Sequence, residues 1–233
     1  MKDVIIACDF ATRDDLRTFL SKFTGEKPYL KIGMELFFGE GPSIVREVKE
    51  KGHPVFLDLK LHDIPNTVKK AMQNLARLGV DMVNVHAAGT IAMMAAAREG
   101  LNTGALAGAH VQLIAVTQLT STGEETMHKE LLISAGLNET VIHYAKNAKA
   151  AGLDGIVCSP LEARMVKDAC GEGFVTVTPG IRYPEAGADD QVRITTPQKA
   201  REIGTDYIVV GRPITAAQDP AAAYQRIKRD FIG

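Results

Sequence analysis

Three charged residues alternate in sign within segment 56–66, which reads FLDLKLHDIPN. Asp58 and Lys60 stand at the end of an apolar run, and Asp63 follows shortly after. Ionised groups at the end of a buried strand are costly to desolvate, and they usually persist for chemistry. An ammonium beside carboxylates can stabilise developing negative charge and deliver a proton. A structural ion pair between Asp58 and Lys60 is the alternative interpretation.

The residues around this pair predict a buried strand over 55–59, because the short apolar run lies between a Gly-His-Pro sequence and a later proline. Side chains alternate along a strand. Asp58 and Lys60 are therefore expected on one face, and the leucines beside them on the other.

The segment after this strand offers its own helix caps. A helix rich in Lys and Ala is expected from about Asn66, and either Asn66 or Thr67 can cap its N-terminus. Asp63 is not needed as a cap, so it is available for another task.

Two further charges lie near the ends of the preceding apolar strands. Residues 4–8 predict a strand that ends at Asp9, and residues 29–32 predict one that carries Lys31. Three successive strands thus each deliver a charge near the C-terminal end, which is natural in a barrel of parallel strands.

The rest of the chain alternates short apolar strands with helical segments. Five more strands are expected over residues 82–85, 111–116, 155–158, 174–177 and 207–210. Helices are expected over residues 14–23, 43–51, 68–78, 91–99, 139–151, 161–169, 197–203 and 216–228. Eight such units predict a (β/α)8 TIM barrel, an α/β fold in which active-site groups gather at the C-terminal ends of the strands. A doubly wound open sheet is the alternative, but no GxGxxG follows the first strand.

Composition narrows the function classes. The chain is 45% hydrophobic and 24% charged, and no linker rich in Pro, Gly or Ser divides it, so a single domain over residues 1–233 is expected. A net charge of -1 provides no excess positive charge with which to bind nucleic acid. The N-terminus leads straight into a strand, and no apolar run approaches the roughly 18 residues of a membrane span. These features predict a cytoplasmic protein without a membrane partner.

Cysteine and histidine patterns argue against a metal or redox site. Cys8, Cys158 and Cys170 form no CxxC pair, and a packing role is expected for all three. The six histidines contain no HExxH or HxH, so no dedicated zinc site is expected. His86, at the end of the fourth strand, is either a core histidine bonded to carbonyls or a catalytic one.

The second half of the chain has features of a phosphate site. Pro179 and Arg182 follow the seventh strand, ahead of a polar segment up to Thr196 whose length is typical of a lid or binding loop. After the eighth strand, Gly211 lets the backbone approach a ligand, and Arg212 offers a bidentate grip. TIM barrels often bind phosphate at these two loops. A simple turn with a solvated Arg212 is the alternative.

These motifs together resemble one known family. The sequence DLKLHDIPNT, with Asp9 and Lys31 before it and PGIR and VGRPI after it, is similar to that of the orotidine 5'-phosphate decarboxylase family, which makes UMP in pyrimidine biosynthesis. The resemblance runs from the first strand to the last helix. It implies a (β/α)8 homodimer whose active site lies at the subunit interface and works without metal or organic cofactor.

The resemblance also assigns roles to individual residues. It implies that Lys60 is the proton donor within a charge array formed by Lys31, Asp58, Lys60 and Asp63. The implied substrate contacts are Asp9 and Lys31 at the ribose, Thr120 at the pyrimidine, Arg182, Gln191, Gly211 and Arg212 at the phosphate, and Pro179 as a further binding residue. Asp63, Ile64 and Thr67 are implied to reach in from the partner subunit.

Two other functions use the same barrel differently. Relatives similar to 3-keto-gulonate 6-phosphate decarboxylase or hexulose phosphate synthase share DxKxxD but bind Mg2+, in part through a Glu where this chain has Lys31. A cation at that position repels Mg2+. A noncatalytic sugar-phosphate binding protein would use Gly211 and Arg212 but has no need of four alternating charges.

Overall fold

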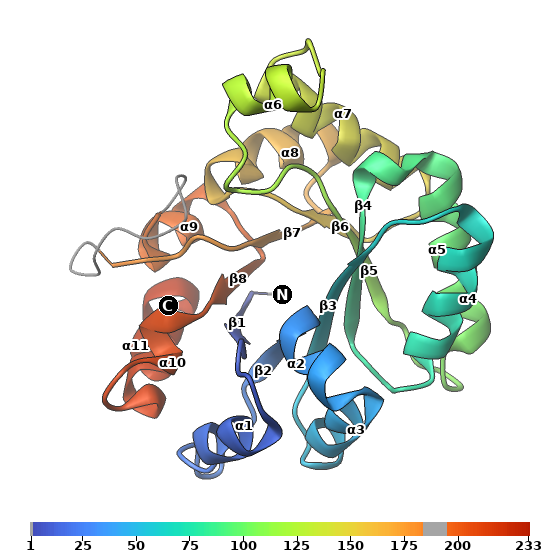
Figure 1. Ribbon diagram of the computed structural model, residues 1–233. Helices are drawn as coiled ribbons and strands as arrows, with labels where there is room; N and C mark the ends of the chain where they lie inside the picture. Colours follow the sequence, from blue (N-terminus) through green and yellow to red (C-terminus); the bar gives the residue numbers. More distant parts are fainter. Residues whose placement is uncertain (1, 184–194) are drawn as a thin grey trace.

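The computed structural model describes residues 2–183 and 195–233. Its eight strands are parallel to their neighbours and follow one another in chain order, and β8 pairs with β1 to close a barrel (Figure 1). The strands are β1 (Asp3–Ala7), β2 (Tyr29–Gly33), β3 (Val55–Leu61), β4 (Met82–His86), β5 (Gln112–Val116), β6 (Gly155–Val157), β7 (Val175–Thr178) and β8 (Tyr207–Val210). The predicted (β/α)8 barrel is confirmed, and the alternative of an open sheet is wrong.

Helices surround the ring of strands (Figure 1). They are α1 (Arg13–Leu20), α2 (Met34–Glu40), α3 (Pro42–Glu50), α4 (Pro65–Ala76), α5 (Thr90–Gly104), α6 (Glu124–Glu130), α7 (Leu137–Ala150), α8 (Ala163–Cys170), α9 (Pro197–Ile203), α10 (Arg212–Thr215) and α11 (Pro220–Ile232), with the short 3-10 helices η1 (Ala87–Gly89) and η2 (Pro160–Glu162). Within the described ranges, no helix combines the length and the apolarity needed to cross a membrane.

Helices α2, α6, α10 and α11 differ from the sequence prediction, and α10, of only 4 residues, was not predicted. Helices α2 and α6 were not predicted, because each has only 7 residues, too few to show a clear apolar period. The predicted helix over 216–228 is wrong at its start, since α10 ends at Thr215 and α11 begins at Pro220. Asp219 caps α11 by accepting the N–H of Ala222.

The predicted cap of α4 is also wrong. Asn66 and Thr67 lie within the first turn, and the N-cap position is Ile64, which makes no side-chain cap bond. Pro65 occupies the first helical position, where its fixed φ suits the helix and its missing N–H leaves no donor unpaired. The carboxylate of Asp63 accepts the N–H of Ile64 at 2.6 Å, just before the helix.

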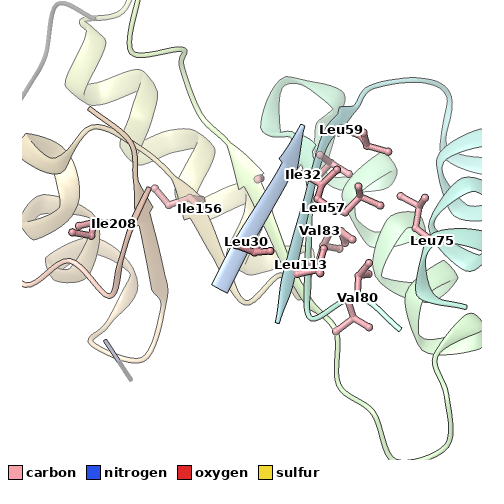
Figure 2. Close-up of a cluster of buried hydrophobic side chains, with 14 of the residues drawn as sticks. Leu30, Ile32, Leu57, Leu59, Leu75, Val80, Val83, Leu113, Ile156 and Ile208 are labelled. Carbon is pink, nitrogen blue, oxygen red and sulfur yellow. The ribbon is translucent and has the colours of Figure 1, made fainter. Parts of the chain in front are cut away.

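Side chains alternate between two apolar cores. Residues that face the barrel axis form the inner core, which contains Ile5, Ala7, Tyr29, Phe56, Met82, Ile114, Val177, Tyr207 and Val209. Strand residues of the opposite parity pack against the helices in an outer core, of which Figure 2 labels Leu30, Ile32, Leu57, Leu59, Val83, Leu113, Ile156 and Ile208, together with Leu75 of α4 and Val80 of the turn before β4. Side chains alternate along each strand, and the same alternation determines which residues at the C-terminal ends of the strands point into the barrel.

Three even-numbered strands begin with the same Gly-X-Asp turn. The turns are Gly79-Val80-Asp81 before β4, Gly152-Leu153-Asp154 before β6 and Gly204-Thr205-Asp206 before β8. The three glycines have φ values of 72, 80 and 98°, a conformation that glycine adopts without steric cost. Each turn therefore places an aspartate at the N-terminal end of its strand.

Each of these aspartates ties three elements together. The aspartates accept backbone N–H groups from the preceding odd strand, namely those of Val55, Leu113 and Thr176, at 2.7, 2.7 and 2.8 Å. They also pair with a cation from the helix before that strand, respectively Lys49, Arg98 and Lys167. We call each arrangement an aspartate clamp, because it joins a helix, an odd strand and the following even strand.

The clamp at Asp206 should contribute strongly to stability. The Lys167 side chain is 3% exposed, and its Nζ lies 2.6 Å from Asp206. Asp206→Ala leaves this buried ammonium without a carboxylate, so the free energy of unfolding should fall by about 3 kcal/mol. Urea unfolding followed by circular dichroism measures the change.

Glu125→Ala is the matched control, since it removes an ion pair in which both side chains are largely exposed. It should change the free energy of unfolding by less than about 0.5 kcal/mol. Equal effects of the two substitutions would show that the clamp is not a stabilising element.

Candidate active site

Inward-facing positions continue past the C-terminal ends of the strands and line a cavity of about 590 Å³. Lys31 follows the inner-core residue Tyr29 by two positions, and Asp58 follows Phe56 in the same way. The alternation of side chains therefore turns both charges into the cavity. A cavity of this volume is typical of a site for a small molecule.

The barrel brings together nine of the site residues that were predicted from the sequence. They are Asp9, Lys31, Asp58, Lys60, Thr120, Pro179, Arg182, Gly211 and Arg212, and all of them line the cavity. They come from β2 and β3 and from the segments after β1, β5, β7 and β8. Residues far apart in sequence thus meet at one end of the barrel.

Four nominated residues are not part of this lining. Asp63, Ile64 and Thr67 are exposed beyond the end of β3, and the Ile64 side chain is 67% exposed. Gln191 lies outside the described residues, as does most of the polar segment predicted to act as a lid.

Asp58 lies between two ammonium groups. Nζ of Lys60 donates to Oδ1 of Asp58 at 2.6 Å, and Nζ of Lys31 lies 3.4 Å from Oδ2. Lys31 also donates to Oδ1 of Asp9 at 2.9 Å. The side chains of Lys31 and Asp58 are only 12% and 10% exposed, whereas those of Lys60 and Asp9 are 26% and 59% exposed. These four residues form a row of alternating charge with a buried centre.

The row keeps its buried members ionised. Burial opposes the charge of Asp58, but Lys31, Lys60 and the hydrogen bonds to Asp58 outweigh it and hold the pKa of that carboxyl below its usual value. Burial likewise opposes the charge of Lys31, and the carboxylates of Asp58 and Asp9 reverse the effect, so the pKa of Lys31 is raised. Both groups therefore carry their charge at neutral pH.

Among the cavity residues that the sequence analysis missed are two buried amides, Asn84 and Gln118. Both are buried, Asn84 on β4 and Gln118 after β5. Asn84 donates to Asp58 at 2.6 Å and accepts the backbone N–H of Lys60 at 2.8 Å. The signal was present, because Asn84 follows the inner-core residue Met82 by two positions in an otherwise apolar strand.

The ends of β7 and β8 bring two guanidinium groups to the cavity. Arg182 and Arg212 both line it, together with Gly180 and Gly211. Gly180 has a φ of 83°, which exposes the backbone at a turn that a larger side chain would strain. Arginine forks and close backbone approach suit an oxyanion such as phosphate.

His86 and the cysteines lie outside the cavity lining. The ring of His86 is 5.8 Å from that of His62, and burial, followed by the charges of His62 and Lys60, lowers the pKa of His86. All three cysteines are free thiols in buried positions. Burial raises the pKa of Cys8 and Cys170, which makes them poor nucleophiles.

The donor set of the cavity does not favour a divalent cation. Lys31 stands between Asp9 and Asp58, the carboxylates that would otherwise attract one. Among residues 2–183 and 195–233, no group of three or more His, Cys, Asp or Glu side chains is arranged to hold a metal ion.

Comparison with known proteins agrees with this site. The model of the "Orotidine 5'-phosphate decarboxylase / HUMPS family" matches residues 2–227. Orotidine 5'-phosphate decarboxylase of Enterococcus faecalis is 60% identical over 229 residues, 97% of each chain, and that of Geobacillus thermodenitrificans is 57% identical over 230 residues, 98% of this chain and 96% of the relative. The crystal structure of orotidine 5'-phosphate decarboxylase from Lactobacillus acidophilus has a TM-score of 0.91 at 41% identity and covers 100% of both chains. The chain therefore belongs to the orotidine 5'-phosphate decarboxylase / HUMPS family.

Proposed function

We propose that this protein converts orotidine 5'-phosphate to UMP and CO2, in pyrimidine biosynthesis, without a metal or organic cofactor. The observation that carries the proposal is the buried row in which Lys31 and Lys60 flank Asp58 at the cavity. Within the family, a cation at the position of Lys31 favours the metal-free reaction over the Mg2+-dependent ones. The relatives named above are decarboxylases of this substrate.

The chemistry of the reaction requires a fixed cation. Loss of CO2 breaks the bond at C6 of the orotate ring and leaves an electron pair in an sp2 orbital that the ring cannot delocalise. In this proposal the ammonium of Lys60 stabilises that pair and then transfers its proton to C6. Asp58 holds the ammonium in place through a 2.6 Å hydrogen bond.

Asp58 contributes a second effect in this proposal. Its ionised carboxylate lies next to the position of the substrate carboxylate, so the two repel each other in the bound substrate. The repulsion disappears as CO2 departs, which favours the transition state over the ground state. The lowered pKa of Asp58 supports this role because the group remains charged.

Phosphate is assigned to the other charged part of the cavity. Arg182, Gly211 and Arg212 supply two guanidinium groups and a closely approaching backbone, and Gln191 is proposed as a further contact. The phosphate lies far from the breaking bond, so its binding energy serves to position the ring. Thr120, Pro179 and Asp9 complete the proposed contacts to pyrimidine and ribose.

The proposal includes a homodimer with shared sites. Asp63, Ile64 and Thr67 lie exposed beside the cavity end of β3, where they would complete the site of a partner subunit. Large apolar side chains are also exposed on α2, with Phe38 at 70%. A cytoplasmic location belongs to the same proposal, supported by three free thiols, as is usual in a reducing compartment.

Turnover with and without EDTA tests the metal-free reaction. Wild-type protein should convert orotidine 5'-phosphate to UMP at the same rate in both conditions, measured by the change in absorbance. Lys60→Ala should reduce kcat by at least about 1,000-fold, because it removes both the charge and the proton. Lys22→Ala, at an exposed lysine, is the control and should retain full activity. Activity abolished by EDTA would point to a Mg2+-dependent member of the family.

Subunit mixing tests the shared site. Lys60→Ala and Asp63→Ala homodimers should each be inactive, since every site lacks one of the two groups. In an equal mixture half of the dimers are heterodimers with one intact site of two, so about a quarter of wild-type activity should return. Native mass spectrometry reports heterodimer formation. Heterodimers without activity would refute the exchange of Asp63 between subunits.

A substrate without phosphate tests the role of Arg212. Arg212→Gln should lower kcat/KM for orotidine 5'-phosphate by about 100-fold or more, because it removes a charged partner of the phosphate. The same substitution should leave kcat/KM for orotidine unchanged. A similar loss for both substrates would mean that Arg212 does not bind phosphate.

A further inference from the structure

Asn84 connects two functional groups of the neighbouring strand through one amide. Its Nδ2 donates to Oδ1 of Asp58 at 2.6 Å, and its Oδ1 accepts the backbone N–H of Lys60 at 2.8 Å. The residue is 1% exposed and faces the cavity. Because a backbone N–H can only donate, the amide oxygen must face Lys60 and the amide nitrogen must face Asp58.

The backbone around Lys60 explains why this amide is needed. Leu57 pairs with Val83 and Leu61 with Val85, so three residues of β3, 58–60, stand opposite Asn84 alone. Such a bulge leaves strand groups without their ladder partners. The Asn84 side chain supplies the acceptor that the ladder does not provide for the N–H of Lys60.

Lys60 also has an unusual conformation. Its φ is 51°, in the left-handed region that residues with a Cβ rarely adopt. Such a conformation persists only where surrounding contacts hold it, and it is found preferentially at functional sites. Asn84 provides one of those contacts directly at the Lys60 backbone.

We propose that Asn84 is a positioning residue for the proton donor, because it holds the backbone of Lys60 and the carboxylate of Asp58 in one fixed relation. The inference rests on the proposed function and deepens it by identifying what sets the geometry of its central pair. Oδ1 of Asp58 accepts from both Asn84 and Lys60 at 2.6 Å, so the amide orients the same oxygen that orients the ammonium.

A neutral amide suits this position for an electrostatic reason. It donates to Asp58 without adding a charge, so the alternation of Asp9, Lys31, Asp58 and Lys60 is preserved. Burial raises the pKa of Asp58, and the hydrogen bond from Asn84 joins the charges of Lys31 and Lys60 in lowering it below its usual value. A carboxylate in its place would face Asp58 at the same short distance.

Two substitutions separate the contributions of the amide. Asn84→Leu removes both hydrogen bonds with little change in volume, and it should reduce kcat by about 10- to 100-fold with KM changed by less than about threefold. Asn84→Asp keeps the acceptor for Lys60 but replaces the donor to Asp58 with a second carboxylate.

The Asn84→Asp variant should acquire a new pH dependence. Two adjacent carboxylates share a proton, which raises one pKa, so activity should rise as pH falls and that proton is taken up. The other titratable or charged groups near Asp58 are Lys31, Lys60, Asp9 and His86, all present in the wild type as well. The difference between the two pH profiles of kcat/KM therefore reports the substituted residue.

Thr117→Val is the matched control. Thr117 is buried just after β5, and its Oγ1 donates to the carbonyl of Val157 at 3.0 Å, away from the charge row. This variant loses one buried hydrogen bond at the same end of the barrel and should retain wild-type kcat. Urea midpoints and UMP affinity are measured for every variant, which separates loss of folding from loss of positioning.

The outcomes distinguish the inference from the proposed function. An inactive wild type would overturn the proposed function, and the role of Asn84 with it. An active wild type with Asn84→Leu and Asn84→Asp as active as Thr117→Val would overturn the inference alone. If Asn84→Leu does not fold, the Asn84→Asp variant tests the inference alone. A pH profile of kcat/KM for Asn84→Asp that is identical to that of the wild type would then reject the positioning role.

Discussion

The burial of Asp58 between two ammonium groups is the interaction on which the site depends. A carboxylate in this position is costly to desolvate alone, and so is Lys31, but together with Lys60 and Asp9 they form a row in which each charge has an opposite neighbour. The register of β2 and β3 makes the row possible, since it places Gly33 beside Asp58. A Cβ at Gly33 would lie 3.3 Å from both Asp9 and Lys31, so the glycine leaves room for their ion pair.

Strand alternation links the core to the chemistry. The alternation that points Tyr29 and Phe56 toward the barrel axis also points Lys31 and Asp58, two residues later, into the cavity. The apolar inner core thus forms the floor of the site, and the charges rest directly on it. A low-dielectric floor strengthens the interactions above it.

Much of this arrangement could be predicted from local patterns. The apolar runs predicted every strand, and the residues at or after their ends included every charged side chain of the cavity lining. Asn84 was not predicted, because its contacts with Lys60 and Asp58 depend on a bulge in the pairing of β3 with β4, and the sequence of neither strand alone indicates that bulge. The start of α4 was misassigned because Pro65 competed with two residues that usually cap helices. Asp63 lies exposed beyond β3 in the single chain, and its proposed role in a site rests on a homodimer.

The aspartate clamps divide the barrel into unequal units. Each clamp belongs to a stretch of helix, odd strand, helix and even strand, so the chain from α3 to β8 contains three such modules, which end at β4, β6 and β8. The first two strands stand apart, because Lys27 and Pro28 precede β2 where the other even strands have a Gly-X-Asp turn. Asp9 and Lys31 belong to this unclamped part, while Arg182 lies within the last module and Arg212 follows its final strand. New termini placed between two modules by circular permutation would leave each clamp within one continuous stretch of chain. The loops between modules are therefore the sites at which we expect this barrel to tolerate new termini.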